Sequence, residues 1–352
     1  MNDPNEKVYY PGLDGLRGIA ILLVVLYHYF PFFRIGWIGV DLFFVLSGFL
    51  ITSILLRTRN KRDYFKNFYI RRSLRIFPLY FLFLLLFYIG LQLFFHDRSA
   101  TSAYAYYTKH QLWFVGFLQN WLIIKEGPPP EPYLIHFWSL AVEEQFYLAW
   151  PFMIFFIKEI QKVKIFLMII ILAALVIRCS LWLYQLPNQP YYYNSFARFD
   201  SLAAGSFLAI IIFEKRTLSP WTKRLAYLAF SILLCTAWLG FRSFEHNNLL
   251  FATFGYSVSA FFFVVICEEC LHRKSFLHLS FLQYLGRISY GIYVYHLPVF
   301  LAGTSVLKQL TFFRNDNQII TTFVCLLATL VISTISYYFL EVPFLKLKPK
   351  FV

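Results

Sequence analysis

The chain has 352 residues, of which 59% are hydrophobic, 22% aromatic and only 14% charged. An ordinary soluble domain carries about a quarter charged residues, so this composition excludes a soluble globular protein. The formal net charge of +14 would suggest nucleic-acid binding in a soluble protein. Here the positive-inside rule accounts for most of it, so we expect membrane lipids and no nucleic acid among the partners.

Long apolar blocks predict an all-α polytopic protein of the cytoplasmic (inner) membrane, with residues 1–352 forming a single transmembrane domain. A transmembrane helix needs about 20 apolar residues to cross a hydrocarbon core of about 30 Å. The N-terminal stretch MNDPNEKVYYPG is polar and has no signal-peptide pattern, so the first block is expected to remain as an anchor. About ten helices are predicted, at roughly 15–34, 36–56, 76–95, 138–157, 165–184, 200–214, 225–241, 249–268, 288–307 and 318–340.

The basic residues set the predicted orientation. Most of the 32 Lys and Arg fall in the segments 1–17, 57–75, 158–164, 215–224, 273–287 and 346–350 when the N-terminus is placed inside. Positively charged loops remain cytoplasmic. Both chain termini are therefore predicted to be cytoplasmic.

The first predicted helix holds two ionisable residues, Arg17 and His28, with ten residues between them. At 1.5 Å per residue, His28 lies about 16 Å beyond Arg17 along the helix. An imidazole near the middle of the membrane is costly and is by default a functional-site hypothesis. Its neutral form can accept a proton; the alternative is a packing contact with a neighbouring helix.

Asp41 follows in the outer part of the second predicted helix, within GVDLFFVLSGF. A short turn makes the first two helices antiparallel neighbours, so Asp41 could approach His28. A carboxylate beside an imidazole fixes its tautomer and stabilises its cation. The alternative is that Asp41 caps its helix. Gly39 and Gly48 are expected to allow close helix packing.

Three arginines open the third predicted helix, in IRRSLRIFP. Arg71 and Arg72 lie four and three residues before Arg75, so the three share one helix face. Guanidinium groups suit phosphates, and a cytoplasmic cofactor with several phosphates would fit. Contact with lipid headgroups is the alternative.

The stretch from 96 to 137 is the longest predicted outside connection, and its segment 112–124 is interpreted as an interfacial or re-entrant helix.

Beyond this connection, the stretch HFWSLAVEEQFYLAWP places Glu143 and Glu144 about two turns inside the outer end of the fourth helix. Charges so placed rarely face lipid. Glu143 is a candidate acid, base or orienting group; Glu144 and Tyr147 are candidate substrate contacts, although Tyr147 could belong to an aromatic belt.

Two weaker patterns complete the candidates. Arg198 and Asp200 open the sixth helix and are either a structural ion pair or part of an outward-facing acceptor site. The ninth helix contains Tyr290, Tyr293 and His296, which either line a cavity or form hydrogen bonds with one another. The five cysteines include one C-x-x-C pair without further ligands at zinc spacing, so no metal is expected.

Taken together, these motifs resemble integral-membrane acyltransferase family 3, whose members O-acylate cell-surface glycans and related molecules. A basic residue, ten residues and a histidine match Arg17 and His28. R-x-x-R matches Arg72 and Arg75, and S-L-x-x-E ends at Glu143. GVDLFFVLSGF, RFDSLAAG, SYGIYVYHLP and LEVPF resemble further blocks of the family, in order from about residue 9 to 345.

The resemblance implies acetyl-coenzyme A as a cytoplasmic acyl donor and a sugar hydroxyl, on a polysaccharide or lipid-linked sugar, as the acceptor. Arg17, Arg71, Arg72 and Arg75 would bind the donor, and His28 would act as general base or form an acyl-histidine. Glu143 and Asp41 would approach from the outer side. Many members carry an extra extracytoplasmic hydrolase-like domain; its absence from this sequence predicts direct transfer, or an oligomer or separate periplasmic partner.

A different class of function remains on physical grounds. A transporter or flippase of a lipid-linked sugar would also have about ten helices and buried ionisable groups along its pathway. Two features argue against it: the two halves of the chain show no visible repeat, and the arginines point to the cytoplasm.

Overall fold

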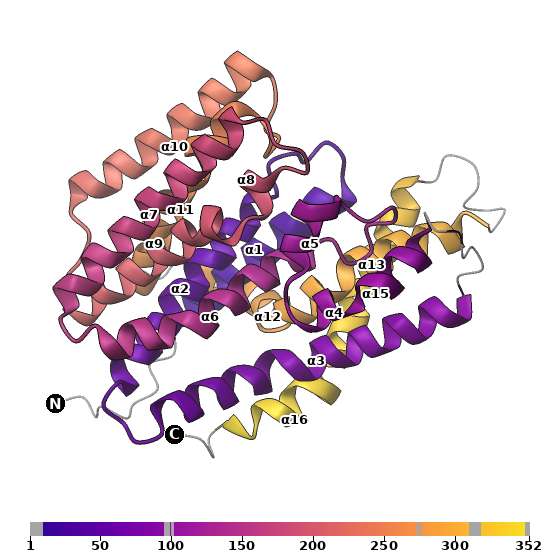
Figure 1. Ribbon diagram of the computed structural model, residues 1–352, viewed down its shortest axis with the longest axis horizontal. Helices are drawn as coiled ribbons and strands as arrows, with labels where there is room; N and C mark the ends of the chain where they lie inside the picture. Colours follow the sequence, from indigo (N-terminus) through magenta and orange to yellow (C-terminus); the bar gives the residue numbers. More distant parts are fainter. Residues whose placement is uncertain (1–9, 95–98, 100–101, 273–275, 310–317, 349–352) are drawn as a thin grey trace.

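The protein is a bundle of helices, shown as a ribbon in Figure 1. The structure is a computed structural model and describes residues 10–94, 99, 102–272, 276–309 and 318–348. Within these residues all regular structure is helical and there is no strand. The predicted all-α membrane fold is therefore confirmed.

The helices follow one another with short connections. The first half contains α1 (Pro11–Tyr29), α2 (Ile38–Thr58), α3 (Tyr64–Phe94), α4 (Ala103–Val115), α5 (Gln119–Glu126), α6 (Phe137–Phe156) and α7 (Ile160–Leu183). The second half contains α8 (Pro190–Tyr193), α9 (Ser195–Phe213), α10 (Pro220–Phe241), a π-helix η1 (Phe251–Gly255), α11 (Tyr256–His272), a 3-10 turn η2 (Phe276–His278), α12 (Ser280–Arg287), α13 (Ser289–Leu307), α15 (Gln318–Ser336), a π-helix η3 (Tyr337–Glu341) and α16 (Val342–Leu345).

Nine spans within the described residues are long and apolar enough to cross a membrane. Helix α6, which carries two glutamates, is not among these nine, although its 20 residues match the predicted block 138–157. By length and apolarity, the described residues therefore hold nine candidate spans, against the predicted ten. The cytoplasmic position of both termini stays a prediction.

Helix α3 differs from the prediction, because it begins at Tyr64 rather than near residue 76. No glycine or proline interrupts the chain between Tyr64 and Pro78, so nothing stops the helix from extending into the basic segment. Its 31 residues are about 46 Å long, which exceeds the hydrocarbon core of about 30 Å. The arginines predicted at the start of this helix therefore lie two to three turns inside it.

The segment 112–124, interpreted as one interfacial or re-entrant helix, is divided between α4 and α5. Helix α4 ends at Val115 with Gly116 as its C-cap, and Phe117 has a positive φ of 54°. A positive φ breaks a right-handed helix. The two short helices lie beside α6 and α3 in Figure 1.

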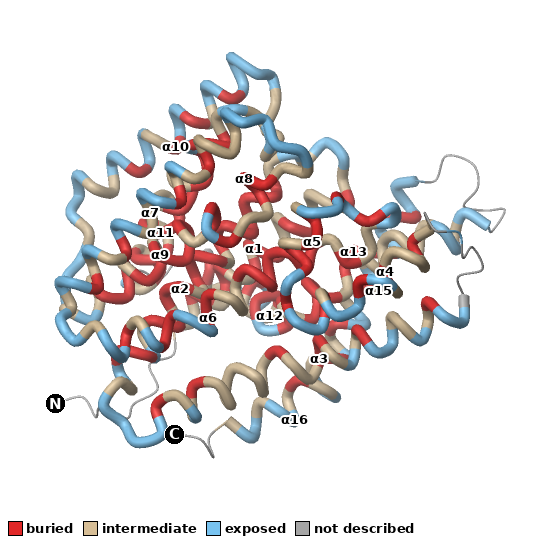
Figure 2. The backbone as a smooth tube through the Cα atoms, viewed as in Figure 1, coloured by how far each residue is buried: buried red, intermediate tan, exposed pale blue. Residues whose placement is uncertain are grey.

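Helices α1, α2 and α9 form the buried centre of the bundle (Figure 2). Two glycines allow α2 and α9 to touch: a Cβ on Gly48 would lie 1.9 Å from the carbonyl oxygen of Leu202, and one on Gly205 would lie 2.0 Å from that of Val45. Small residues permit such close approach in membrane helices. The packing role predicted for Gly48 is confirmed.

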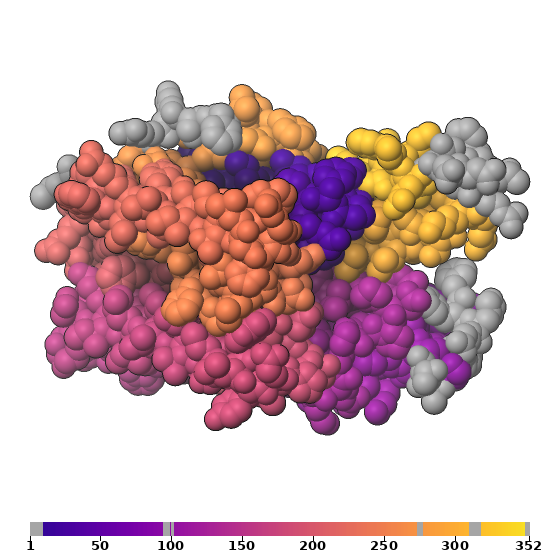
Figure 3. All heavy atoms as spheres, turned by 90° about the horizontal axis from the view of Figure 1, so that it is seen from above, coloured from indigo at the N-terminus to yellow at the C-terminus, as the bar shows by residue number. Residues whose placement is uncertain are grey.

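Other helices form the outside of the bundle. Only 17% of the apolar window of α7 and 22% of that of α10 are buried within the protein, against 72% for α2. The remainder consists of large apolar side chains such as Leu172, Leu228 and Leu239, as expected for surfaces that face lipid. Figure 3 shows the yellow C-terminal helices at one end of the molecule and the orange and magenta helices at the other.

Candidate active site

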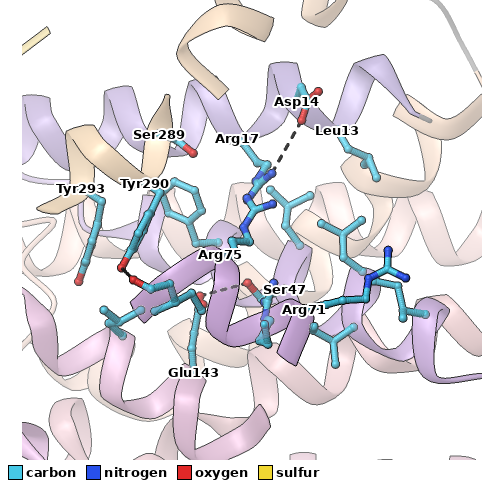
Figure 4. Close-up of a pocket in the computed structure, with 18 of the residues that line it drawn as sticks. Leu13, Asp14, Arg17, Ser47, Arg71, Arg75, Glu143, Ser289, Tyr290 and Tyr293 are labelled. Atoms are coloured by element: carbon cyan, nitrogen blue, oxygen red, sulfur yellow. Dashed lines mark hydrogen bonds and ion pairs between the residues drawn. The ribbon is translucent and has the colours of Figure 1, made fainter. Parts of the chain in front are cut away.

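A cavity of about 330 Å³ opens among α1, α2, α3, α6 and α13. The first and last described residues, Tyr10 and Lys348, both line it. Figure 4 shows Arg17 and Glu143 on opposite sides of this cavity, with Arg75 between them in that view. The cavity is therefore built from segments that lie more than 300 residues apart in the sequence.

The wall of the cavity is strongly basic. Four arginines predicted to bind a donor and one lysine that was not predicted line it: Arg17, Arg71, Arg72, Arg75 and Lys348. The acidic groups that line it are Asp14 and Glu143. Arg17 lies 3.8 Å from Asp14, and the guanidinium of Arg72 stacks 4.1 Å above the ring of Tyr147. Cations exceed anions, so the cavity suits a ligand with several negative charges.

Glu143 lies on the same wall and is held in place by two hydroxyl groups. Tyr147 donates a hydrogen bond to its Oε2 at 2.7 Å, and Ser47 donates to its Oε1 at 3.1 Å. Glu143 therefore shares the cavity with the arginines. Its approach from the outer side of the membrane stays a prediction. Ser47, within the GVDLFFVLSGF block, was not recognised as a contact from sequence.

Glu144, the neighbouring carboxylate, differs in its surroundings. It does not line the cavity, and its Oε1 atom is buried with no hydrogen-bond partner among the described residues. Successive helical residues point about 100° apart, so only one of the two glutamates can face the cavity. The structure gives that place to Glu143, as the spacing of its motif favours.

Tyr293 and Ser139 both line the cavity and contact each other. The Tyr293 hydroxyl donates its single proton to the carbonyl oxygen of His136. The Ser139 hydroxyl therefore donates to the Tyr293 oxygen, at 2.8 Å. These bonds link α13 to Ser139 of α6 and to His136, the residue before that helix.

His28 is not among the described residues that line the cavity. Its Nδ1 atom is 2.9 Å from the carbonyl oxygen of Val24 and 3.3 Å from Nε2 of His296. The ring of His296 lies 5.9 Å from that of Tyr293, centroid to centroid. His28 is thus two side chains away from the cavity, through His296 and Tyr293.

Asp41, predicted to approach His28, has other partners. Its Oδ1 atom lies 2.6 Å from Nη2 of Arg198 and accepts a hydrogen bond from Ser201 at 3.1 Å. Asp41 and Arg198 are both fully buried. The residue that contacts His28 is His296, so the expected carboxylate–imidazole pair is not formed.

Arg198 and Asp200, considered as an ion pair with each other, are each paired with another residue. Asp200 lies 2.8 Å from Arg178, a fully buried arginine of α7 that the sequence analysis missed. Arg198 is surrounded by aromatic rings, the nearest being Tyr256 at 3.9 Å. An arginine in an apolar stretch is itself a signal, and this signal could have identified Arg178.

No metal site was expected. In the part of the chain that the structure describes, no group of three or more His, Cys, Asp or Glu side chains is arranged to hold a metal ion.

Comparison with known proteins gives the family. The family model described as an acyltransferase domain matches residues 10–338. The chain is 32% identical to the peptidoglycan O-acetyltransferase OatA of Listeria monocytogenes, over 97% of this chain and 56% of that protein. It is also 32% identical to the putative peptidoglycan O-acetyltransferase YrhL of Bacillus subtilis, over 95% and 55%. No solved structure matches.

A third relative, the O-acetyltransferase OatA of Staphylococcus aureus, is 28% identical over 96% of this chain and 57% of its own length. The chain therefore spans about half the length of the curated relatives it matches. The match to the family model covers nearly the whole chain and confirms the resemblance of its motifs: the chain belongs to integral-membrane acyltransferase family 3.

Proposed function

We propose that this protein is a membrane O-acetyltransferase of the cytoplasmic membrane, with residues 1–352 acting as one domain. It transfers an acetyl group from cytoplasmic acetyl-coenzyme A to a hydroxyl group of a cell-surface glycan. The relatives named for peptidoglycan make peptidoglycan the first acceptor to test. The observation that carries the proposal is the basic cavity, whose lining residue Tyr293 is connected through His296 to His28.

The donor fits the cavity by charge. Coenzyme A carries a diphosphate and a ribose phosphate, and Arg71, Arg72 and Arg75 present guanidinium groups from one helix to the cavity. Arg17 faces it from α1. With the phosphates held by these arginines, the pantetheine arm would lead the thioester inward, toward Ser139 and Tyr293.

His28 is the proposed base. The hydroxyl group of the acceptor gives its proton to His28. The hydroxyl oxygen then forms a bond to the thioester carbonyl carbon. The carbon–sulfur bond then breaks, and the coenzyme thiolate takes the proton from the imidazolium. An acyl-histidine formed on the same side chain is the second route. In either route Tyr293 must move, because it lines the cavity and connects it, through His296, to His28.

Glu143 is proposed to orient groups near the thioester rather than to act on His28. Its two oxygens accept hydrogen bonds from Tyr147 and Ser47, and it lines the cavity that we propose for the donor. Asp41, Arg198 and Asp200 belong to the buried ion pairs described above and are proposed to keep the helices around the site in position.

The test is acetyl transfer by the purified protein in lipid nanodiscs, with acetyl-coenzyme A labelled in its acetyl group and peptidoglycan fragments as acceptor. We expect His28→Ala to abolish transfer while acetyl-coenzyme A still binds and the protein remains folded. Arg72→Gln together with Arg75→Gln should weaken donor binding by at least about tenfold, because two charge-assisted contacts are lost.

The outcomes of these experiments distinguish an acetyltransferase from a flippase. Near-normal transfer by the His28→Ala variant would show that the imidazole is not the base. Movement of a lipid-linked sugar across the bilayer without acetyl transfer would instead support the flippase. Donor binding that is unaffected by the arginine substitutions would exclude the cavity as the donor site.

A further inference from the structure

A second histidine contacts the proposed base. Nε2 of His296 lies 3.3 Å from Nδ1 of His28, and the two ring centroids are 4.9 Å apart. His296 is completely buried, whereas His28 is partly buried. The two residues come from α1 and α13 and are 268 positions apart in the chain, so only the fold brings them together.

The carbonyl groups around the two rings define which nitrogen atoms carry hydrogen. Nδ1 of His296 lies 2.8 Å from the carbonyl oxygen of Tyr293. A carbonyl oxygen can only accept, so this Nδ1 must be a donor, and a neutral ring then has its lone pair on Nε2. Nδ1 of His28 faces the carbonyl oxygen of Val24 at 2.9 Å and is a donor for the same reason.

The two assignments agree with each other. The lone pair on Nε2 of His296 faces the hydrogen on Nδ1 of His28, so this hydrogen is shared between Val24 and His296. Nε2 of His28 is consequently left with its lone pair. That nitrogen is the one that can accept a proton from an acceptor hydroxyl.

Helix α13 is held so that His296 stays in this position. Pro298 has no N–H group and leaves the carbonyl oxygen of Val294 without its helical donor. Nε2 of His136, the residue before the neighbouring α6, lies 3.3 Å from that oxygen. The Tyr29 hydroxyl donates to the carbonyl oxygen of His296 at 2.9 Å, which links α13 to the residue next to His28.

We infer that His296 is a positioning residue for His28, holding it as the Nδ1–H tautomer with Nε2 directed to the substrate. This inference rests on the proposed function. When His28 takes up the acceptor proton on Nε2, its Nδ1–H becomes a stronger donor, and the lone pair of His296 receives part of the charge. An imidazole thus takes the place of the carboxylate that supports histidine in the familiar catalytic triads.

The test compares two substitutions at one position. His296→Leu removes the acceptor, whereas His296→Gln keeps an oxygen at about the reach of Nε2. We expect His296→Leu to lower kcat at least about tenfold, which is less than the roughly 10²–10⁴-fold of a lost acid–base group because His28 itself remains. The Kd for acetyl-coenzyme A should stay within about twofold. His296→Gln should recover most of the lost kcat.

His110 provides a matched control, because it is also a buried helical histidine. Its Nδ1 contacts the carbonyl oxygen of Tyr106 four residues earlier, at 2.8 Å, and it lines no part of the cavity. We expect His110→Leu to lower the thermal midpoint, since it breaks the contact with Glu126 at 2.9 Å. The kcat should remain that of the wild type.

A spectroscopic measurement tests the contact without activity. In protein labelled with 15N at histidine, the bond between Nδ1 of His28 and Nε2 of His296 should give a nitrogen–nitrogen coupling that disappears in His296→Gln. Equal losses of kcat in the Leu and Gln variants, or no loss in either, would overturn the inference. So would transfer by wild-type protein without the coupling. Wild-type protein that shows the coupling and transfers no acetyl group would contradict the proposed function itself.

Discussion

Lys348 lies after the last helix and outside the membrane-spanning segments, yet it lines the basic cavity. Burial is the first cause that lowers the pKa of its ammonium group to about 6, and the charges of Arg75, Arg72 and Arg71 lower it further. Glu341 opposes this shift. Lys348 is therefore mostly neutral at pH 7 while the cavity is empty.

The affinity for coenzyme A should depend on pH through Lys348. A bound polyanion favours the charged ammonium, so binding at pH 7 takes up a proton. The Kd for coenzyme A is therefore lowest below about pH 6. Above this pH it rises by at most about tenfold per pH unit, because one proton is linked to binding. Asp14 and Arg17 face the same cavity from α1. Calorimetry in buffers of different ionisation enthalpy measures the proton uptake directly.

Lys348→Arg is the control for this effect, because a guanidinium remains charged at every pH of the experiment. The variant should bind coenzyme A without the lysine-linked proton, and any remaining pH dependence belongs to the ligand phosphates. Identical proton uptake by the wild type and the arginine variant would show that Lys348 does not take part.

At the scale of helices, a buried polar cluster connects α2, α7, α9 and the segment from η1 into α11. Arg178 of α7 donates from Nε to the carbonyl oxygen of Thr253 in η1 at 2.9 Å, and Ser257 donates to Asp200 at 2.6 Å. A π-helical turn displaces backbone carbonyls from their usual bonds, which gives the arginine an acceptor. Arg198 and Asp41 complete the cluster on α9 and α2.

Arg178→Met should destabilise the protein strongly, because it leaves the Asp200 carboxylate buried without its cation. Loss of one partner of a buried pair costs about 3–5 kcal/mol. The free energy of unfolding in detergent, measured by chemical denaturation, checks this value. The double variant Arg178→Met with Asp200→Leu should be more stable than the single one, since it removes both charges.

Lys162 and Glu159 supply the comparison at the surface. They lie 2.7 Å apart with both side chains 66% exposed, so Lys162→Gln should leave the unfolding midpoint unchanged. If Arg178→Met also left the unfolding midpoint unchanged, the buried polar cluster would not stabilise the packing of these helices.

On the scale of the whole molecule, the cavity brings residues near the two ends of the chain, Tyr10 and Lys348, together with Ser139 and Tyr293. The basic loops predict that the side of the protein with Tyr10 and Lys348 is cytoplasmic. A donor from the cytoplasm and an acceptor outside the cell would then reach His28 from opposite directions.

Cysteine labelling tests this orientation. Lys61 and Asn247 are both exposed and lie between helices on opposite sides in the predicted topology. In a background without Cys235, the exposed native cysteine, a membrane-impermeant maleimide should label Asn247→Cys in intact cells. It should label Lys61→Cys only after the membrane is opened. The reverse pattern would invert the topology and place the basic cavity outside the cell.

Much of the fold could be predicted from sequence, because apolar length alone specifies a membrane helix. The basic side of the site was also predictable, since Arg71, Arg72 and Arg75 repeat at helical spacing. The hydrogen-bond and ion-pair partners of the buried groups could not be predicted from sequence. Asp41 lies near His28 along the chain but pairs with Arg198, and Glu143 lies on the cavity wall rather than beyond it. Helical spacing gives a face but does not say which helix that face meets.

The sequence by itself determined the membrane helices, their predicted orientation and the residue types that carry chemistry, because burial in lipid makes each apolar block and each charge within it informative. Only the tertiary structure decided which side chains meet. It joined His28 to His296 across 268 positions and brought Lys348 to the arginines of α3. Such contacts depend on how α1, α13 and the C-terminal segment pack together, which the periodicity of a single helix does not contain.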